Sequence, residues 1–374
     1  MQAYCNQKIL QSRFPDARVE IIDYRPPETR RKEYSKLITT PGSQLIRGDL
    51  PTGFFNQLGK IKAIRRFIQD EMNVSNAYCR TNNIDRIKDF IEKQNYSAIV
   101  VGSDIVWSAR PGGYEPEQPN IFTLPNINER YKVSLAASMD QTDESHLFTN
   151  VRSQRMAKYI SDFDYITVRE RYTKERLADM GVPKKDINVV CDPTLLWNFK
   201  DLIENPKLDL SGNETVGLEI GNISIKEDIS ENLIESGWEV VNLLGPTFQD
   251  EIELSSKLTV PQRLGVYNNL DLIVTDRFHG SIFTLKTSNT PVIYIEPVDK
   301  YPESKSKGRD LYERIGIEEQ IWRYDGNIPE GVIEDHLTSW NSNKDFVKTG
   351  IKSMQENSEP YLNELQAVIE GCQG

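Results

Sequence analysis

The chain has 374 residues, which is enough for two domains of ordinary size. Its 45 Lys and Arg against 56 Asp and Glu give a net charge of −11 at pH 7. That balance argues against non-specific nucleic-acid binding, which needs cations to displace counterions from phosphate. A membrane-spanning helix needs about 20 mainly apolar residues, and the longest aliphatic runs, Ala98–Val101 and Leu272–Val274, are far shorter. We therefore predict that no helix crosses a bilayer.

The start of the sequence, residues 1–10, has neither the basic region nor the apolar run of a secretory signal. The 4 cysteines and 3 histidines lie far apart, without the spacing of a zinc site or a disulfide framework. We therefore expect no bound metal, and we predict a cytoplasmic protein with reduced thiols.

Short apolar runs alternate with polar stretches of helical period, which is typical of an α/β protein. Several runs are almost continuously apolar, as in parallel strands covered by helices on both faces. The expected strands are Arg18–Asp23, Ser97–Gly102, Lys132–Ala137, Tyr165–Val168, Ile187–Val190, Thr215–Ile220, Glu239–Leu244, Asp271–Thr275 and Pro291–Ile295. The expected helices are Ala3–Phe14, Ile84–Lys93, Tyr172–Met180, Ile225–Ser236 and Val260–Asn269.

The stretch Asn198–Glu214 contains Asn, Asp, Pro and Gly without a clear period, which suits a linker between domains. We predict an N-terminal domain over residues 1–200 and a C-terminal domain over residues 201–340. Residues 341–374 are expected to form a helical tail that is interrupted near Pro360.

No strand precedes the helix expected at Ala3–Phe14, although a strand follows it at Arg18–Asp23. The first domain is therefore expected to lack the opening strand of its first βαβ unit. A neighbouring strand would then expose unpaired backbone groups, which proteins usually cover.

The densest group of polar residues, Asp276–Ser281, follows a predicted strand and precedes the helix-like stretch Ile282–Lys286. In open parallel sheets, ligands bind beyond the carboxyl ends of strands and close to helix N-termini. There Arg277 can hold a carboxylate or phosphate, His279 can move a proton, and Gly280 lets the backbone approach a ligand. The alternative is that Arg277 pairs with a nearby acid and that His279 only caps a loop.

Two further strand ends carry candidate residues in the first domain. Arg169 ends the strand at Tyr165–Val168, where it either holds an anion or forms a surface charge pattern with Glu170. Gly102, Ser103 and Asp104 form a small-residue turn that either cradles an anion or sugar hydroxyls or only packs tightly.

Motifs of several common sites are missing from the sequence. We find no GxGxxG or GxxxxGK[ST] fingerprint, which disfavours the usual nucleotide sites, and no GxSxG elbow of α/β-hydrolases. The basic cluster Lys305–Arg309 reads as a solvated loop, although it could add charge near a cleft. Strand ends that carry arginine, together with a loop histidine, predict a cleft for a small polyanion.

Five segments resemble the polysaccharide pyruvyl transferase family in order and spacing, and Asp276–Gly280, within the last of them, is the most specific. The segments are Leu10–Tyr24, Val100–Trp107, Ile166–Glu170, Cys191–Leu196 and Thr275–Pro291. The resemblance implies two Rossmann-like domains facing each other across a cleft, as in GT-B glycosyltransferases. It also implies transfer of a pyruvyl group from phosphoenolpyruvate to two hydroxyls of a sugar, forming a cyclic ketal without a cofactor.

By position, Arg277 and His279 match the family's donor-site Arg and His, and Arg169 matches a donor-site Arg of the first domain. We expect the two arginines to hold the donor, and His279 to deliver a proton or stabilise the leaving phosphate. The implied acceptor is a saccharide or a lipid-linked saccharide in cell-surface or exopolysaccharide synthesis, with a possible peripheral link to glycan assembly machinery.

The sequence departs from the family at Ile105, where Gln is common, and at Met139-Asp140, where Phe-Gly is usual. Both departures affect the sugar side of the expected site more than the donor side. Two other functions stay open, namely a GT-B glycosyltransferase that uses a nucleotide sugar and a non-catalytic saccharide-binding protein.

Overall fold

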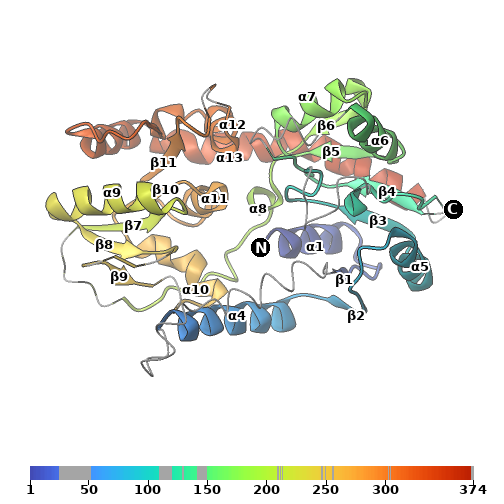
Figure 1. Ribbon diagram of the computed structural model, residues 1–374, viewed down its shortest axis with the longest axis horizontal. Coiled ribbons are helices and arrows are strands. Elements are labelled where there is room, and N and C mark those ends of the chain that lie inside the picture. The colour runs from blue at the N-terminus through green and yellow to red at the C-terminus, as the bar shows by residue number, and fades with distance from the viewer. Residues whose placement is uncertain are drawn as a thin grey trace. The chain divides into compact units, whose positions relative to one another are not determined.

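The structure is a computed structural model that describes residues 1–24, 52–108, 120–128, 130–140, 150–208, 210, 212, 214–245, 247–248, 250–254, 257–301, 303 and 305–371. The chain forms two compact units (Figure 1). Unit 1 comprises Met1–Asp49, Ile68–Trp197 and Met354–Gly374, and unit 2 comprises Leu50–Phe67 and Asn198–Ser353. Both ends of the chain therefore belong to unit 1, which differs from the three consecutive segments expected from the sequence.

Unit 2 contains a six-stranded sheet in the order β12-β11-β10-β7-β8-β9, and every neighbouring pair in it is parallel. When these six strands are numbered 1 to 6 in chain order, their order across the sheet is 6-5-4-1-2-3, which is the doubly wound arrangement. The order reverses between β7 and β10, where such sheets bind ligands. The strands are β7 (Thr215–Glu219), β8 (Glu239–Asn242), β9 (Ile252–Glu253), β10 (Leu272–Thr275), β11 (Val292–Pro297) and β12 (Ile321–Tyr324).

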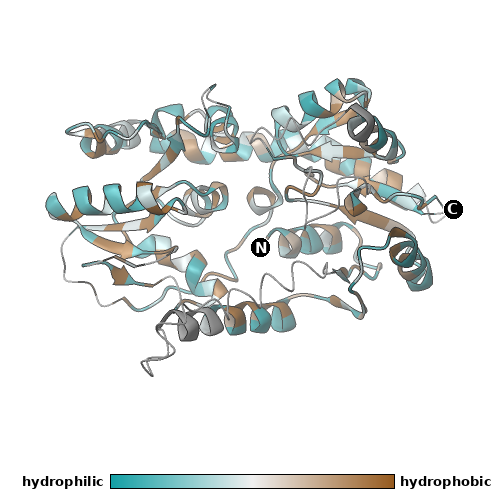
Figure 2. Ribbon diagram, in the orientation of Figure 1, coloured by the Kyte–Doolittle hydropathy of each residue, from teal (hydrophilic) through white to brown (hydrophobic). Residues whose placement is uncertain are grey.

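The strands of unit 2 are apolar, and the helices beside them turn polar residues outward (Figure 2). Burial of both faces explains the continuous apolar runs that marked these strands in the sequence. The helices are α9 (Ile223–Glu235), α10 (Val260–Gly265), α11 (Phe278–Thr287), α12 (Lys307–Ile315) and the first part of α13 (Val332–Glu370), with short 3₁₀ turns at Val266–Asn269 and Glu318–Gln320.

Unit 1 is also built from parallel strand pairs. β1 pairs with β2, β3 with β4, and β5 with β6, and two bridges, Val133 to Tyr165 and Ala137 to Val168, join β4 to β5. Within the described ranges, no strand pairs with the second edge of β1 or of β3. The strands are β1 (Ile21–Tyr24), β2 (Val74–Cys79), β3 (Ala98–Val101), β4 (Tyr131–Ser134), β5 (Ile166–Val168) and β6 (Ile187–Val189).

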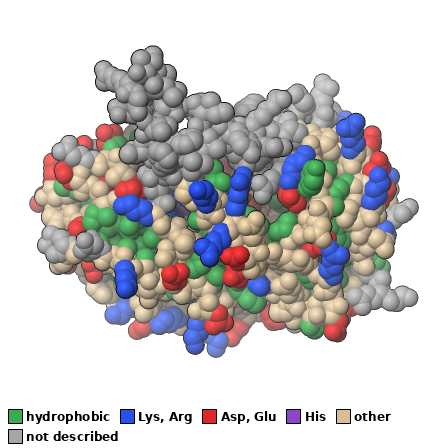
Figure 3. Space-filling view, turned by 90° about the horizontal axis from the view of Figure 1, so that it is seen from below, with side chains coloured by type: hydrophobic (Ala, Val, Ile, Leu, Met, Phe, Trp, Pro, Cys, Tyr) green, Lys and Arg blue, Asp and Glu red, His purple; other side chains and the backbone are tan. Residues whose placement is uncertain are grey.

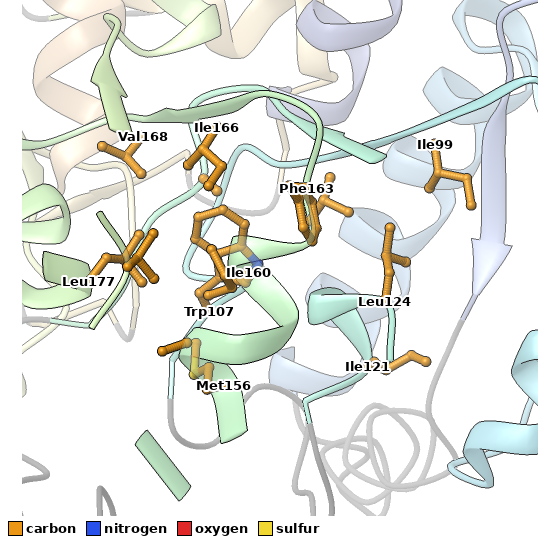
Figure 4. Packing of buried hydrophobic residues seen from close by; sticks show 14 of the residues in the cluster. Ile99, Trp107, Ile121, Leu124, Met156, Ile160, Phe163, Ile166, Val168 and Leu177 are labelled. Atoms are coloured by element: carbon orange, nitrogen blue, oxygen red, sulfur yellow. The ribbon is translucent and has the colours of Figure 1, made fainter. Parts of the chain in front are cut away.

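A core of aromatic and aliphatic side chains holds unit 1 together, and Trp107 lies at its centre with no exposed surface (Figure 4). The Trp107 ring meets Phe163 edge to face with centroids 5.7 Å apart, and its Nε1 donates to the Phe122 carbonyl at 3.0 Å. The helices are α1 (Gln2–Arg13), part of α4 (Thr52–Glu71), α5 (Ile84–Gln94), α6 (Asn150–Ser161), α7 (Arg171–Asp179), α8 (Pro193–Leu196) and the end of α13, with 3₁₀ turns at Ile121–Thr123 and Lys184–Asp186.

The predicted strands and helices are present, with ends shifted by a few residues. The sequence did not predict β2, β9 and β12, which are short or interrupted by polar residues. α11 begins at Phe278 rather than near Ile282, so His279 lies in its first turn. α13 runs through Pro360 without the expected interruption, because Met354, Leu362 and Leu365 are buried on both sides of the proline.

The surface carries charges of both signs. On the face shown in Figure 3, Lys and Arg side chains are interspersed with Asp and Glu rather than gathered in one basic field. No helix among the described residues is long and apolar enough to cross a membrane.

The ion pair between Lys226 and Glu251 is fully buried, with Nζ and Oε2 3.1 Å apart. Glu251 also accepts hydrogen bonds from Ser230 Oγ and the Phe248 amide. Removing the cation would leave a buried carboxylate uncompensated. We expect Lys226→Met to lower the free energy of unfolding by about 3 kcal/mol.

Urea unfolding followed by circular dichroism measures this change. The control is Lys184→Met, because Lys184 pairs with Glu175 where both side chains are more than half exposed. Its effect should stay within about 0.5 kcal/mol. Equal losses in the two variants would contradict the importance of the buried pair.

Candidate functional site

The strongest candidate site lies at the switch point of the unit 2 sheet. Asp276 and Arg277 connect the end of β10 to the start of α11, and Gly221 and Asn222 connect the end of β7 to the start of α9. Because β7 and β10 are adjacent and parallel, both loops lie at the same edge of the sheet. The sequence predicted the first loop and missed the second.

Asp276 ties these two loops together. Its Oδ1 accepts a hydrogen bond from the Gly221 amide at 2.9 Å, and its Oδ2 accepts from the Asn222 amide at 3.3 Å. The same Oδ1 lies 2.9 Å from Nε of Arg277. Arg277 therefore does pair with a nearby acid, as the alternative interpretation expected, but only one edge of its guanidinium faces that acid.

The rest of the Arg277 guanidinium lies over Gly221. A Cβ at position 221 would stand 1.0 Å from Nη2 of Arg277, so only glycine leaves room for the arginine here. The Arg277 side chain is 47% exposed. The pair with Asp276 thus orients a guanidinium that still reaches solvent at the carboxyl end of the sheet, where it can bind an anion.

The N-terminus of α11 adds backbone donors to this site. Its N-cap residue, Arg277, makes no side-chain capping bond, whereas α9 is capped by Asn222, which accepts from the Ser224 and Ile225 amides. The first amides of a helix lack partners within the helix and attract anions. The N-terminus of α11 therefore lies where a phosphate or carboxylate would be stabilised by the helix dipole.

His279 is half-buried in the first turn of α11. Its ring meets Phe278 edge to face at 5.2 Å and lies tilted against Phe283 at 6.1 Å, measured between centroids. These aromatic rings restrict the orientation of the imidazole. His279 and Arg277 thus lie two residues apart at one helix end, as the sequence predicted, and His279 belongs to the helix rather than to a loop.

A buried cluster below Gly280 was missed by the sequence interpretation. Glu219, the last residue of β7, accepts from Arg263 Nη2 at 2.6 Å and from the Tyr267 hydroxyl at 3.0 Å. A Cβ on Gly280 would stand 2.2 Å from Oε2 of Glu219, so glycine is required for α11 to approach this carboxylate. In the sequence, the one sign that Glu219 belongs to the site was its position at a strand end.

The charges in this cluster shift the pKa values of its members. Burial lowers the pKa of Arg263, but the Glu219 carboxylate outweighs it, so the pKa rises above its usual range. Burial and the same carboxylate raise the pKa of Tyr267. Arg263 therefore stays cationic and Tyr267 stays a neutral donor across the physiological pH range. Both continue to bond the Glu219 carboxylate that lies beside Gly280.

Arg169 occupies a different environment in unit 1. The residue is 2% exposed, with Nε 2.5 Å from Glu170 and Nη1 2.9 Å from Asp192. Its Nη2 donates to Ser138 Oγ at 3.1 Å. Burial alone would lower the pKa of Arg169, but the two carboxylates raise it above its usual value. Glu170 and Arg169 thus form a buried ion pair, not the surface charge pattern considered from the sequence.

The turn after β3 is held by this ion-pair network. The Ser103 carbonyl accepts from Arg169 Nη1 at 3.2 Å and from Gln2 Nε2 at 3.0 Å. A Cβ on Gly102 would stand 1.9 Å from the Leu135 carbonyl oxygen, which supports the interpretation of tight packing for that glycine. Asp104 is exposed. Ser103 is 2% exposed, and its Oγ has no hydrogen-bond partner among the described residues.

Side chains of the basic cluster Lys305–Arg309, after β11, form hydrogen bonds and ion pairs within unit 2. Ser306 caps α12 by accepting from the Arg309 amide, and Arg309 pairs with the buried Glu296 at 2.8 Å. Lys305 pairs with Glu303 in solvent, with both side chains at least 70% exposed. No group of three or more His, Cys, Asp or Glu is placed to hold a metal ion in the part of the chain that the structure describes.

The model of the polysaccharide pyruvyl transferase family matches residues 1–299, which is most of the chain. The chain belongs to the polysaccharide pyruvyl transferase family. Its match includes the Asp276–Gly280 segment at the switch point, and the family makes this protein a transferase. No curated protein matches the sequence.

Solved structures resemble the chain in fold at low sequence identity. The glycotransferase of kitacinnamycin has 10% identity and a TM-score of 0.50, with 99% of this chain and 94% of that chain covered. A UDP-GlcNAc 2-epimerase from Neisseria meningitidis has 10% identity and a TM-score of 0.49, with 82% and 88% covered. The fold of this chain is that of GT-B-like proteins, with Rossmann-like α/β units.

We expect Gly221→Ala to weaken anion binding by displacing the Arg277 guanidinium. The methyl group would overlap only the end of a flexible side chain, so the loss of stability should stay below about 1 kcal/mol. Affinity for inorganic phosphate, measured by isothermal titration calorimetry, should fall about tenfold.

Gly371→Ala is the matched control, because no atom lies within 4 Å of a Cβ there. If phosphate binds Gly221→Ala as tightly as the unchanged protein, the guanidinium over Gly221 does not hold the anion.

Arg169→Met should behave differently from Arg277→Met. The first change leaves Glu170 and Asp192 buried without their cation, so we expect a loss of about 3–5 kcal/mol in the free energy of unfolding. The second removes a side chain that is 47% exposed and should cost less than about 1 kcal/mol. Chemical denaturation of both variants tests this difference, and equal losses would contradict it.

Proposed function

We propose that the protein transfers a pyruvyl group from phosphoenolpyruvate to two hydroxyls of a saccharide, forming a cyclic ketal. The observation that carries the proposal is the junction of β10 and α11, where Arg277, His279 and the N-terminus of α11 meet at the switch point. Membership of the pyruvyl transferase family supports the same reaction. The donor is a substrate, and no cofactor is required.

Phosphoenolpyruvate carries a phosphate and a carboxylate, and this junction offers binding groups for anions of both kinds. The dipole of α11 favours the phosphate at the N-terminus of that helix. The Arg277 guanidinium, held from one edge by Asp276, offers its other donors to the second anionic group. Arg169, which is surrounded by carboxylates in unit 1, then acts by positioning the turn at Ser103 rather than by holding the donor.

The proposed chemistry has two steps. One sugar hydroxyl adds to C2 of the enol and gives up its proton, while a proton is delivered to the C3 methylene, which becomes a methyl group. The second hydroxyl then bonds to C2 as the C2–O bond to phosphate breaks, and its proton leaves with the phosphate. His279 is the group at the site suited to move these protons, and the cationic surroundings stabilise the departing phosphate.

We propose that the turn Gly102–Asp104 of unit 1 binds hydroxyls of the saccharide. The buried Ser103 hydroxyl lacks a partner among the described residues, and buried polar groups are normally hydrogen-bonded. A sugar hydroxyl would satisfy it, while the exposed carboxylate of Asp104 can accept a further hydrogen bond. We propose that the acceptor is a saccharide or lipid-linked saccharide, as the family resemblance implies. The proposed reaction takes place in the cytoplasm, with a peripheral link to glycan assembly machinery.

The test is incubation with phosphoenolpyruvate and a panel of galactosyl, mannosyl and glucosyl acceptors, following phosphate release and product mass. We expect His279→Gln to lower kcat by about 10²–10⁴-fold with little change in donor affinity. Arg277→Lys should instead weaken donor binding about tenfold, because an ammonium lacks the planar fork.

Two outcomes would replace this proposal. Thermal stabilisation by a UDP- or GDP-sugar, with none by phosphoenolpyruvate, would identify a glycosyltransferase. Saccharide binding without any turnover of phosphoenolpyruvate would identify a binding protein.

Full ketal formation by His279→Gln would remove the proton-transfer role from that residue.

A further inference from the structure

The buried carboxylate of Glu219 lies directly beneath the helix that carries His279 and begins after Arg277. Glu219 is the last residue of β7 and is 7% exposed. A Cβ on Gly280 would stand 2.2 Å from its Oε2, so the carboxylate packs against the first turn of α11. A negative charge is therefore buried beside the place where the proposed donor, a polyanion, binds.

Glu219 also holds this junction through its backbone. Its carbonyl accepts a hydrogen bond from Thr275 Oγ1 at 2.9 Å, and the same Oγ1 accepts from the Arg277 amide at 2.9 Å. The side chain and the main chain of Glu219 thus both contact the junction of β10 and α11. The residue is therefore placed to position the group that binds the donor.

Arg263, on α10, supplies the counter-charge of this carboxylate. Its Nη2 lies 2.6 Å from Oε1 of Glu219, while the Tyr267 hydroxyl donates to Oε2 at 3.0 Å. Arg263 Nη1 also donates to the Leu243 carbonyl, just after β8. Each carboxylate oxygen thus has its own donor, and a side chain of opposite charge lies beside Glu219.

The other charged groups around this pair are of both signs. Burial lowers the pKa of Lys60, on α4, while Glu253 raises it and Arg263 lowers it further. Lys60 and Glu253 therefore oppose each other near Arg263. On the α11 side, Asp276 pairs with Arg277. Because these neighbours are balanced in sign, the charge that offsets Glu219 is that of Arg263.

Charges so close to a binding site change its affinity for an anion. Between groups inside a protein, the interaction of charges is stronger than in water and is screened little by salt. An isolated carboxylate under α11 would repel the phosphate and carboxylate of the donor. When it is paired with Arg263, the same carboxylate contacts the helix with its charge offset.

We propose that Glu219 is a positioning residue of the donor site and that its pair with Arg263 sets how tightly the site holds an anion. Glu219 holds the first turn of α11 in place and weakens anion binding, and Arg263 offsets most of this repulsion. A moderate affinity lets the phosphate product leave after each reaction. The inference rests on the proposed function, because that function places the donor at Arg277.

The deciding variant is Glu219→Gln, which removes the charge and keeps the size of the side chain. Its amide oxygen can accept from Arg263, and its amide nitrogen can donate to the Tyr267 hydroxyl. Inorganic sulfate is the probe because its charge is constant near neutral pH. Since Arg263 would then be an uncompensated cation, we expect the affinity for sulfate, measured by isothermal titration calorimetry, to rise about fivefold.

Two further variants test the charge of the pair. Arg263→Gln leaves the carboxylate without its cation, so we expect the affinity for sulfate to fall about tenfold. The double variant Glu219→Gln/Arg263→Gln removes both charges, and its affinity should return to within about threefold of that of the unchanged protein. The control is Glu175→Gln, which makes the same change in net charge at an exposed ion pair of α7. Solvent screens that charge, so sulfate affinity should not change.

Weaker or unchanged sulfate binding by Glu219→Gln would overturn the proposal, because loss of a merely structural residue does not raise affinity. A double variant that binds as weakly as Arg263→Gln would overturn it as well. Should Arg263→Gln fail to fold, the gain in Glu219→Gln still decides.

Failure of the donor site itself gives a different result. In that case, Arg277→Met would bind sulfate as tightly as the unchanged protein. If Arg277→Met loses sulfate binding while Glu219→Gln binds as before, the donor site stands and only the role of Glu219 and Arg263 is wrong.

Discussion

The carboxylate of Asp276 is the interaction on which the candidate site depends. It accepts the amides that follow β7 and it pairs with Arg277, so one side chain fixes the distance between two loops at the switch point. Charge-assisted hydrogen bonds of this kind are directional and strong. Because Asp276 faces only one edge of the guanidinium, it orients Arg277 without removing it from solvent.

Arg169 and Arg277 show how burial decides what an arginine does. Both follow apolar strands, and the sequence predicted the same role for both. Arg169 is enclosed with Glu170 and Asp192, so loss of its guanidinium would leave two buried carboxylates without their cation. Among the described residues, Arg277 pairs with one carboxylate, and its side chain is half-exposed, so part of the guanidinium reaches solvent.

The two units differ in how their parallel strands are paired. In unit 2, six parallel strands form a continuous sheet, and each strand between the edges has two neighbours. In unit 1, the edges of β1 and β3 border a cavity that two helices cover.

The sequence by itself determined the α/β class, nearly all of the long apolar strands and the segment Asp276–Gly280, because continuous apolar runs and strand-end polar residues are local patterns. Short or polar strands such as β2, β9 and β12 depend on neighbours, so no local pattern marked them. Tertiary structure alone decided that Glu219 supports Gly280, that Gly221 makes room for Arg277, and that Arg169 is buried. Each of these facts depends on residues distant in the chain, whose proximity no local periodicity records.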